Sequence, residues 1–213
     1  YENLSMNIDN VNDRSDWEKS FLTPAIQSQN VDLVLDELGH QGHTSIFTLP
    51  LFNEDYCRQL IDKCETYGRW GEREWAAYPT NDIWLEDIGM QEIYEDAVLR
   101  PHVYPVIAKA WSLGPPWETQ TVEAQNFVAK YDTEGQFHLD LHHDDSLVTV
   151  VVSLNDEFEG GGTYFYRQKM LVTPKKGEAI FHPGNITHRH GARPVTKGAR
   201  YSLVSFIRPM FEE

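Results

Sequence analysis

The chain has 213 residues and a formal net charge of −15 at pH 7, from 18 Lys and Arg against 33 Asp and Glu. Apolar residues make up 40% and aromatic residues 12%, which allows one domain with a sizeable core; a wholly disordered chain is excluded, and no run of about 18 apolar residues is present to span a membrane. The acidic balance argues against a nucleic-acid partner, which would need a basic surface, and fits either a basic substrate or simple solubility.

Residues 1–45 are predicted to form an N-terminal arm or linker remnant. The stretch 1–30 is rich in Asn, Asp and Ser, and only one short helix is expected in it, around residues 16–21. The polar first residues show no signal peptide, although the missing initial Met leaves an upstream leader open.

The first long helix is predicted over residues 53–67. Asn53 is a suitable N-cap and Gly68 follows the last turn, while Leu60 contributes to an apolar stripe. Cys57 and Cys64 lie on one face of this helix, roughly 10 Å apart by helical rise, which is too far for a disulfide. They are expected to be buried thiols, and two cysteines do not define the redox compartment.

A second helical stretch is predicted over residues 91–111, interrupted at Pro101 and Pro105. Between the two helices runs a loop, residues 71–81, with two large aromatic residues, Trp75 and Tyr78. This loop could fold over a substrate, or its aromatic side chains could simply pack in the core or on the surface.

After residue 116 the sequence is typical of β-structure. Short runs rich in β-branched and aromatic residues alternate with Gly, Pro and Asn turns, which indicates a sandwich or barrel. Helices first and strands later suggest a β core with helices on one side. The predicted strands are residues 124–131, 146–154, 163–166, 178–181 and 200–207.

Six of the nine histidines fall between residues 138 and 190, in the strand-rich half. Because residues two apart on a strand face the same side, a His-x-Asp pair aims an imidazole and a carboxylate at one point. With one distant His, such a pair forms the two-His-one-carboxylate site of non-haem Fe(II) oxygenases. A single pair is weak evidence, since a solvated acidic turn has the same composition. This sequence contains three overlapping pairs: His138 with Asp140, His142 with Asp144, and His143 with Asp145.

The distant His has two candidates, His188 and His190, which share one strand parity, so spacing alone leaves both open. Arg200 follows ten residues after His190. A dicarboxylate that chelates a metal at one end needs its other carboxylate held, and the forked guanidinium of Arg suits that role. The hydroxyl of Ser202, two residues on, is expected on the same face and can add a hydrogen bond.

Taken together, these motifs resemble the Fe(II)/2-oxoglutarate dioxygenases of the prolyl and lysyl hydroxylase type, and most closely the catalytic domain of procollagen lysyl hydroxylases. The resemblance runs from about residue 50 to the end and fits the C-terminal domain of a longer enzyme, with a giant-virus member of the family as one candidate. The segments that carry it are HHDDSLVTVVVSLN at 142–155, EGGG at 159–162, PKKG at 174–177, HPG at 182–184, THRH at 187–190 and GARY at 198–201, with LF at 51–52, YG at 67–68, PTNDI at 79–83 and NFVAKY at 126–131 upstream.

The resemblance implies a double-stranded β-helix (jelly roll) with helices packed on one sheet, forming a dioxygenase domain over residues 46–213. It implies His142, Asp144 and His190 as the iron ligands. Arg200 would anchor 2-oxoglutarate, and Tyr131 would line the pocket of that co-substrate.

Other polar residues are expected to stay outside the metal site. His143 and Asp145 should point away from the metal, and His138 and Asp140 should face solvent. His182 should support a turn, and the glycines at 160–162 should form a tight turn rather than a phosphate loop, because no helix or Lys follows in the required place.

The implied activity is hydroxylation of peptidyl lysine, giving 5-hydroxylysine in collagen-like Gly-x-y sequences, with Fe(II), 2-oxoglutarate, O2 and L-ascorbate. A homodimer and the endoplasmic reticulum lumen, or a viral or host equivalent, are also implied. Two alternatives stay open: a prolyl hydroxylase of the same superfamily, and a non-catalytic metal-binding jelly roll. Collagen prolyl hydroxylases of this type use Lys at the anchor position, so Arg200 favours lysine weakly.

Overall fold

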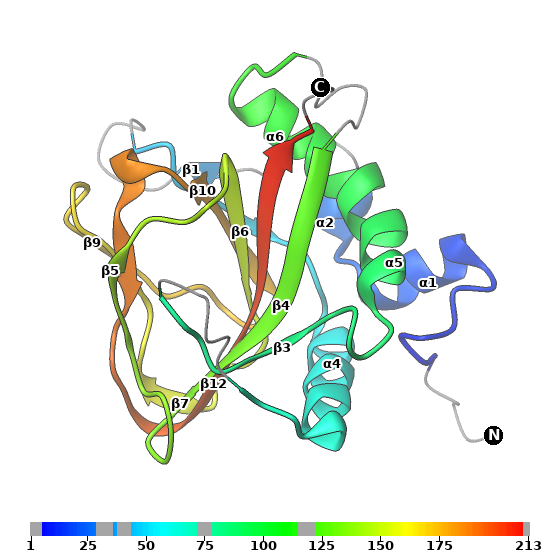
Figure 1. Cartoon of the computed structure of the whole chain (residues 1–213). Coiled ribbons are helices and arrows are strands. Elements are labelled where there is room, and N and C mark those ends of the chain that lie inside the picture. The colour runs from blue at the N-terminus through cyan, green and yellow to red at the C-terminus, as the bar shows by residue number, and fades with distance from the viewer. Residues whose placement is uncertain (1–5, 29–35, 38–43, 72–77, 115–121, 211–213) are drawn as a thin grey trace.

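The computed structural model describes residues 6–28, 36–37, 44–71, 78–114 and 122–210. Two antiparallel sheets face each other, and the helices gather on the outer side of the larger sheet (Figure 1). This arrangement confirms the predicted jelly roll with helices on one sheet. None of the described helices is long and apolar enough to cross a bilayer.

The strands of the large sheet come from both halves of the chain. Their order is β1 (Asp36–Glu37), β2 (Phe47–Pro50), β10 (Glu178–Pro183), β6 (Val148–Ser153), β12 (Val195–Pro209), β4 (Val122–Asp132) and β3 (Asp82–Trp84), and β7 (Phe158–Gly160) pairs with β12 off this path. The small sheet has the order β5 (Leu139–His142), β11 (His190–Ala192), β8 (Thr163–Phe165) and β9 (Met170–Val172).

The central strand β6 shows how one sequence serves two faces. Val150 and Val152 point outward into the core shared with the helices, whereas Thr149 and Val151 point inward and line a cavity between the sheets. Both faces are therefore covered, and every residue of β6 is buried. The inward face of the large sheet is the one that carries the polar residues discussed below.

Helix α4 (Glu54–Tyr67) forms as predicted. The Asn53 side chain accepts a hydrogen bond from the Tyr56 backbone N–H at 3.1 Å, and Gly68 ends the helix at φ +65°. Cys57 and Cys64 are buried and free, as expected.

The second helical stretch is continuous, contrary to the predicted interruptions. It runs through α5 (Gln91–Tyr94), the π-helical segment η1 (Glu95–Val103) and α6 (Tyr104–Ala110). Pro101 lacks an N–H and crowds the preceding turn, and the wider π register accommodates it. Pro105 is the second residue of α6, and its missing N–H forfeits one hydrogen bond of the continuous stretch without ending it.

The N-terminal segment packs into the domain, which differs from the arm expected from its composition. Trp17 and Phe21 of α1 (Arg14–Phe21) are wholly buried in the main core, next to the short α2 (Pro24–Gln27). Their rings contact at 5.1 Å between centroids, and both contact the Tyr56 ring of α4. Most residues of the segment are polar and lie on its exposed face. An overall polar composition therefore did not indicate that its few apolar residues are buried.

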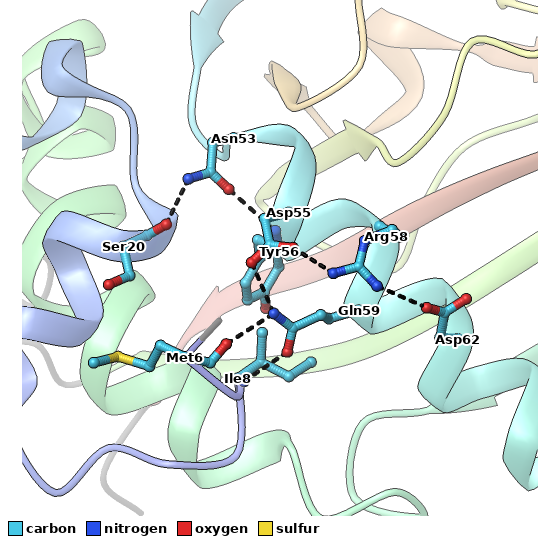
Figure 2. A network of polar contacts seen from close by, with 9 residues as sticks. All are labelled: Met6, Ile8, Ser20, Asn53, Asp55, Tyr56, Arg58, Gln59 and Asp62. Carbon is cyan, nitrogen blue, oxygen red and sulfur yellow. Dashed lines mark hydrogen bonds and ion pairs between the residues drawn. The ribbon is translucent and has the colours of Figure 1, made fainter. Parts of the chain in front are cut away.

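Polar contacts fasten the same segment to α4 (Figure 2). The Gln59 amide donates to the Met6 carbonyl at 2.9 Å and accepts from the Ile8 N–H at 3.1 Å. The Asn53 amide donates to the Ser20 carbonyl at 2.5 Å. Residues 6–28 thus share their core and their hydrogen bonds with the sheet-bearing part of the chain.

Replacing Trp17 by Ala should lower the free energy of unfolding by about 3–5 kcal/mol, because it empties a fully buried site. Urea unfolding of the purified variant measures this change. Lys19→Ala, on the exposed face of the same helix, is the matched control and should change stability by less than about 0.5 kcal/mol. Equal stability of the Trp17 variant and the wild type would show that the segment is a dispensable arm.

Candidate active site

The predicted triad assembles at the edge of the small sheet. His142 ends β5 and His190 begins β11, and the two residues are direct partners across the strands. Asp144 lies in the loop after β5, where its backbone N–H donates to the Gly184 carbonyl at 2.8 Å. One potential ligand atom from each of the three residues lies within 4.8 Å of the other two. The distances from the Asp144 carboxylate are 3.2 Å to Nε2 of His142 and 3.6 Å to Nε2 of His190.

Both imidazoles are oriented by their backbone neighbours. Nδ1 of His142 lies 2.7 Å from the Asp140 carbonyl, and Nδ1 of His190 lies 2.9 Å from the His188 carbonyl. A carbonyl can only accept, so each Nδ1 carries the proton and each Nε2 presents its lone pair toward Asp144. Metal-bound histidines are commonly held in this way.

The Asp144 carboxylate is held and charged. The Thr149 hydroxyl donates to it at 2.6 Å, and the Ser146 hydroxyl lies 2.7 Å from that of Thr149. Burial acts to raise the pKa of Asp144, but the nearby histidines outweigh burial and hold this pKa below its usual range. An ionised carboxylate and two lone-pair nitrogens that face one another favour a cation between them, so the donor set fits a divalent metal with open coordination positions.

The structure separates the two candidates for the distant histidine. His188 ends a single 3-10 turn, Ile186–His188, which breaks the strand parity. Its Nε2 donates to the Thr44 carbonyl at 2.7 Å, and its Nδ1 lies 2.9 Å from the Thr187 hydroxyl. Both of its ring nitrogens are thus engaged away from Asp144, and His190 completes the cluster.

Arg200 lies on the opposite wall of the cavity, on β12, directly paired with Tyr131 of β4. It is only 3% exposed. Its guanidinium donates to the Gly162 carbonyl at 3.2 Å and to the Thr163 hydroxyl at 3.4 Å, and lies 5.8 Å from the centre of the Tyr131 ring. Among the described residues no carboxylate lies within 4.0 Å of it. A buried cation without an anion is costly, so this wall fits an anionic ligand.

The turn at residues 160–162 makes room for that arginine. Gly161 has φ +69°, and a Cβ there would lie 2.8 Å from the Phe158 ring and 3.3 Å from Cδ of Arg200. The predicted tight turn is a two-residue link between β7 and β8, with positive φ at Gly160, Gly161 and Gly162. A side chain at Gly161 would crowd the Phe158 ring and the stem of Arg200.

Two hydroxyls complete this wall. The Ser202 hydroxyl is buried and has no hydrogen-bond partner among the described residues. Burial raises the pKa of Tyr131 to about 12, so its phenol stays protonated as a donor. The cavity has a volume of about 390 Å³ and is lined by all six residues singled out from the sequence: Tyr131, His142, Asp144, His190, Arg200 and Ser202.

The neighbouring acidic and histidine residues lie outside the cluster. Asp140 is exposed and His138 is half-buried, and their side chains lie 3.5 Å apart. His143 and Asp145 are exposed at the cavity mouth, where Asp145 pairs with Arg208 at 3.1 Å.

Of the two aromatic residues in the loop before β3, Tyr78 lies at the cavity, with its ring 5.2 Å from that of His142. Trp75 lies outside the described residues.

His182 was expected to support a turn, but it lies beside the triad. It is wholly buried, and its ring contacts that of His190 edge-on at 4.6 Å. Its Nδ1–H donates to the Pro183 carbonyl at 2.9 Å. The strand predicted over residues 178–181 in fact continues to Pro183 as β10. His182 is therefore a strand residue, and it pairs with Thr149 on the inward face of the sheet.

Acidifying the metal-free protein from pH 7 to pH 5 should lower its free energy of unfolding. Burial, and then the charge of His190, lower the pKa of His182 to about 3, whereas an unfolded histidine titrates at about 6.5. Between these two pH values His182 is protonated in the unfolded chain and neutral in the folded one. Each unit by which the pH is lowered in this range should therefore reduce the free energy of unfolding by up to about 1.4 kcal/mol. His182→Gln should weaken the dependence in urea unfolding, whereas His138→Gln, at a half-buried position outside the cluster, should not. An unchanged slope in the His182 variant would contradict this account.

The chain is similar in sequence to known oxygenases. The family model described as the 2OG-Fe(II) oxygenase superfamily matches residues 127–208. Over 91% of its length the chain is 35% identical to the multifunctional procollagen lysine hydroxylase and glycosyltransferase of Rattus norvegicus and 32% identical to procollagen-lysine,2-oxoglutarate 5-dioxygenase 2 of Mus musculus. The chain spans about a quarter (27%) of the length of each of these relatives.

Solved structures share the architecture. A viral collagen prolyl hydroxylase from Paramecium Bursaria Chlorella virus-1 superposes with a TM-score of 0.60 at 21% identity, covering 81% of this chain and all of that one. A Pseudomonas putida prolyl-4-hydroxylase gives 0.54 at 13% identity, covering 78% and 94%. At these identities the likeness extends to the fold alone.

Proposed function

We propose that the chain is a 2-oxoglutarate/Fe(II) oxygenase, using Fe(II), 2-oxoglutarate and O2, and that it hydroxylates lysine side chains in collagen-like Gly-x-y peptides. The observation that carries the proposal is a single cavity with the His142–Asp144–His190 cluster on one wall and the buried Arg200, without an anion, on the other. A metal alone would leave Arg200 uncompensated, and an anion alone would leave the triad without a cation. A dianionic chelator that reaches from metal to guanidinium satisfies both.

In this proposal each residue has a defined task. His142, Asp144 and His190 would hold Fe(II), which with 2-oxoglutarate and O2 would supply the oxidation: one oxygen atom of O2 would convert a substrate C–H to C–OH, and the other would enter succinate as 2-oxoglutarate loses CO2. Arg200 binds the distal carboxylate of 2-oxoglutarate through its fork, and the Ser202 and Tyr131 hydroxyls donate to the same ligand. The metal-binding side chains and Arg200 are buried between the two sheets, which strengthens these charged contacts.

The choice of lysine rests on the curated relatives. Those at 30–35% identity are named for lysine hydroxylation, whereas the prolyl hydroxylases share 21% or less. The net charge of −15 also favours a basic substrate. Prolyl hydroxylation is the second candidate, because the neighbours in fold carry that name.

Ascorbate as a reductant for oxidised iron and a homodimeric state are further parts of the proposal. They rest on the family resemblance. Light scattering of the purified chain tests the second of them, and a mass of one 24.6 kDa chain at working concentration would contradict a dimer.

The test uses two collagen-like peptides that differ only in carrying Lys or Pro before Gly. Each is incubated with the protein, Fe(II), 2-oxoglutarate and ascorbate, and mass spectrometry locates any added oxygen atom. The proposal predicts oxygen on lysine, dependent on 2-oxoglutarate. Oxygen on proline alone would establish the second candidate. If neither peptide gains oxygen and 2-oxoglutarate is not consumed, the non-catalytic metal-binding module becomes the correct assignment.

A further inference from the structure

A chain of two hydroxyl groups lies behind the carboxylate of the metal cluster. The Thr149 hydroxyl donates to Oδ2 of Asp144 at 2.6 Å, and the Ser146 hydroxyl lies 2.7 Å from that of Thr149. A hydroxyl carries one hydrogen, and an ionised carboxylate can only accept hydrogen bonds. The hydrogen of the Thr149 hydroxyl is therefore used on Asp144, and the hydrogen of the Ser146 hydroxyl points to Thr149.

Thr149 is fixed by its place in the sheet. It is 1% exposed and lies on β6, where it pairs with His182 of β10 on one side and with Phe206 of β12 on the other. A β-branched side chain has few rotamers, so fixing the backbone on both sides also fixes the direction of the hydroxyl. Asp144, in contrast, lies in a loop after β5. The hydrogen bond thus ties a loop carboxylate to a rigid strand.

The two oxygens of the Asp144 carboxylate differ as a result. Oδ2 accepts the Thr149 hydrogen bond and lies 3.6 Å from Nε2 of His190, whereas Oδ1 lies 3.2 Å from Nε2 of His142. A carboxylate can bind a divalent cation through one oxygen or through both. The hydrogen bond occupies Oδ2 and resists rotation of the group, which favours Oδ1 as the oxygen presented to a metal.

Gly184 holds the loop that carries Ser146. The Gly184 carbonyl accepts a hydrogen bond from the Asp144 N–H at 2.8 Å, and the Gly184 N–H donates to the Leu147 carbonyl at 3.1 Å, so the loop is bonded on both sides of Ser146. A Cβ at residue 184 would overlap Oγ of Ser146 and would lie 2.6 Å from its carbonyl oxygen. The absence of a side chain at Gly184 therefore lets the Ser146 hydroxyl reach Thr149.

We propose that Thr149 is the positioning residue of the metal site and that Ser146 orients its hydroxyl. Together they hold Asp144 as a one-oxygen ligand, through Oδ1, for the divalent metal. The inference rests on the proposed function, because it concerns the metal of the same site. Without the Thr149 hydroxyl the carboxylate is free to turn, so metal affinity should fall. A carboxylate that then binds through both oxygens would also occupy a coordination position that 2-oxoglutarate needs.

The test is an absorption titration of the purified chain with Co(II), without O2. The Co(II) spectrum depends on the number and arrangement of its ligands, so one experiment gives both affinity and coordination. Thr149→Val removes the hydroxyl and nearly keeps the volume, Thr149→Ser keeps the hydroxyl, and Ser146→Ala removes the second hydroxyl. Thr48→Val is the matched control, because Thr48 is a buried threonine on β2 of the same sheet and is not among the described residues that line the cavity.

Thr149→Val should weaken Co(II) binding by about 10- to 100-fold, the usual cost of removing a group that supports a metal ligand, and should change the spectrum. Thr149→Ser should return both to near the wild-type values, because it restores the hydroxyl. Ser146→Ala should weaken Co(II) binding by about twofold to tenfold, as for the loss of one neutral hydrogen bond. Co(II)-loaded Thr149→Val should also bind 2-oxoglutarate more weakly than the wild type, and Thr48→Val should match the wild type throughout.

Wild-type affinity and spectrum in Thr149→Val would overturn the positioning role, and so would equal losses in Thr149→Val and Thr149→Ser, which would indicate packing alone. Thermal unfolding shows whether each variant is folded. Ser146 lies half-buried in a loop, so Ser146→Ala decides the matter if Thr149→Val does not fold, and unchanged Co(II) affinity in it overturns the hydroxyl chain. If the wild type binds Co(II) and Thr149→Val binds it equally well, only this inference fails. If the wild type binds no Co(II), the proposed function fails with it.

Discussion

Replacing Asp144 by Ala should abolish the iron-dependent consumption of 2-oxoglutarate. Asp144 is the anionic member of the cluster, and both Nε2 atoms face its carboxylate. Without it, two neutral imidazoles remain to hold a divalent cation. Loss of a residue that merely supports a metal ligand costs about 10- to 100-fold in affinity, so loss of the ligand itself should exceed that. Metal content after dialysis and 2-oxoglutarate turnover measure the two effects.

The matched control for this substitution is Asp145→Ala, since Asp145 is the next residue along, is exposed, and pairs only with Arg208 among the contacts described. It should retain bound metal and turnover. Thermal unfolding of the Asp144 variant verifies that it is folded. Full turnover in the folded Asp144 variant would remove Asp144 from the metal site.

Replacing Arg200 by Ala should raise the concentration of 2-oxoglutarate needed for turnover by about two orders of magnitude or more, while the peptide requirement changes little. Removing one member of a buried, hydrogen-bonded charge pair costs about 2–5 kcal/mol. The structure favours a large effect, because Arg200 is buried and the described contacts of its guanidinium are one carbonyl, one hydroxyl and one ring face. Dependence of the initial rate on 2-oxoglutarate at fixed peptide measures the shift.

Arg200→Lys adds a graded test, because it keeps the charge and loses the fork, so its 2-oxoglutarate requirement should lie between those of wild type and Arg200→Ala. Arg167→Ala, at an exposed position, should behave as wild type. Equal rises in the requirements for 2-oxoglutarate and peptide would indicate a general collapse of the cavity and contradict the anchor.

Much of the candidate site could be predicted because its residues are close in sequence. The sequence shows two short spacings directly: Asp144 follows His142 by two residues, and Arg200 follows His190 by ten. The structure adds the pairing of His190 with His142 across 48 positions, which no local pattern contains. It also separates His190 from His188, because a single 3-10 turn breaks the parity that made them equivalent.

Asp82, which is buried and lines the cavity, shows why part of the cavity lining could not be predicted. It lies on β3, a strand of three residues, too short to show an alternating pattern. It reaches the cavity through a chain of pairings from β3 to β4 to β12.

The fold was predicted best where a pattern was long and local. Helix α4 has the predicted N-cap, the predicted apolar stripe and the predicted terminal glycine. The prediction of an N-terminal arm did not anticipate the burial of Trp17 and Phe21. They are two large apolar residues among many polar ones, and whether they are buried depends on what packs against them. The helix break predicted at Pro101 was wrong for a different reason. The rule that proline interrupts an α-helix does not anticipate a π-helical segment that accommodates the residue.

We infer that the triad and Arg200, on opposite walls of the cavity, form one site for a metal and a dianionic co-substrate. An anaerobic calorimetric titration of 2-oxoglutarate into the protein, with and without one equivalent of Fe(II), tests it most directly. We expect tight one-to-one binding of 2-oxoglutarate that requires Fe(II) and that is lost in both Asp144→Ala and Arg200→Ala. Binding of 2-oxoglutarate that is equally strong without metal, or that survives either substitution, would contradict it.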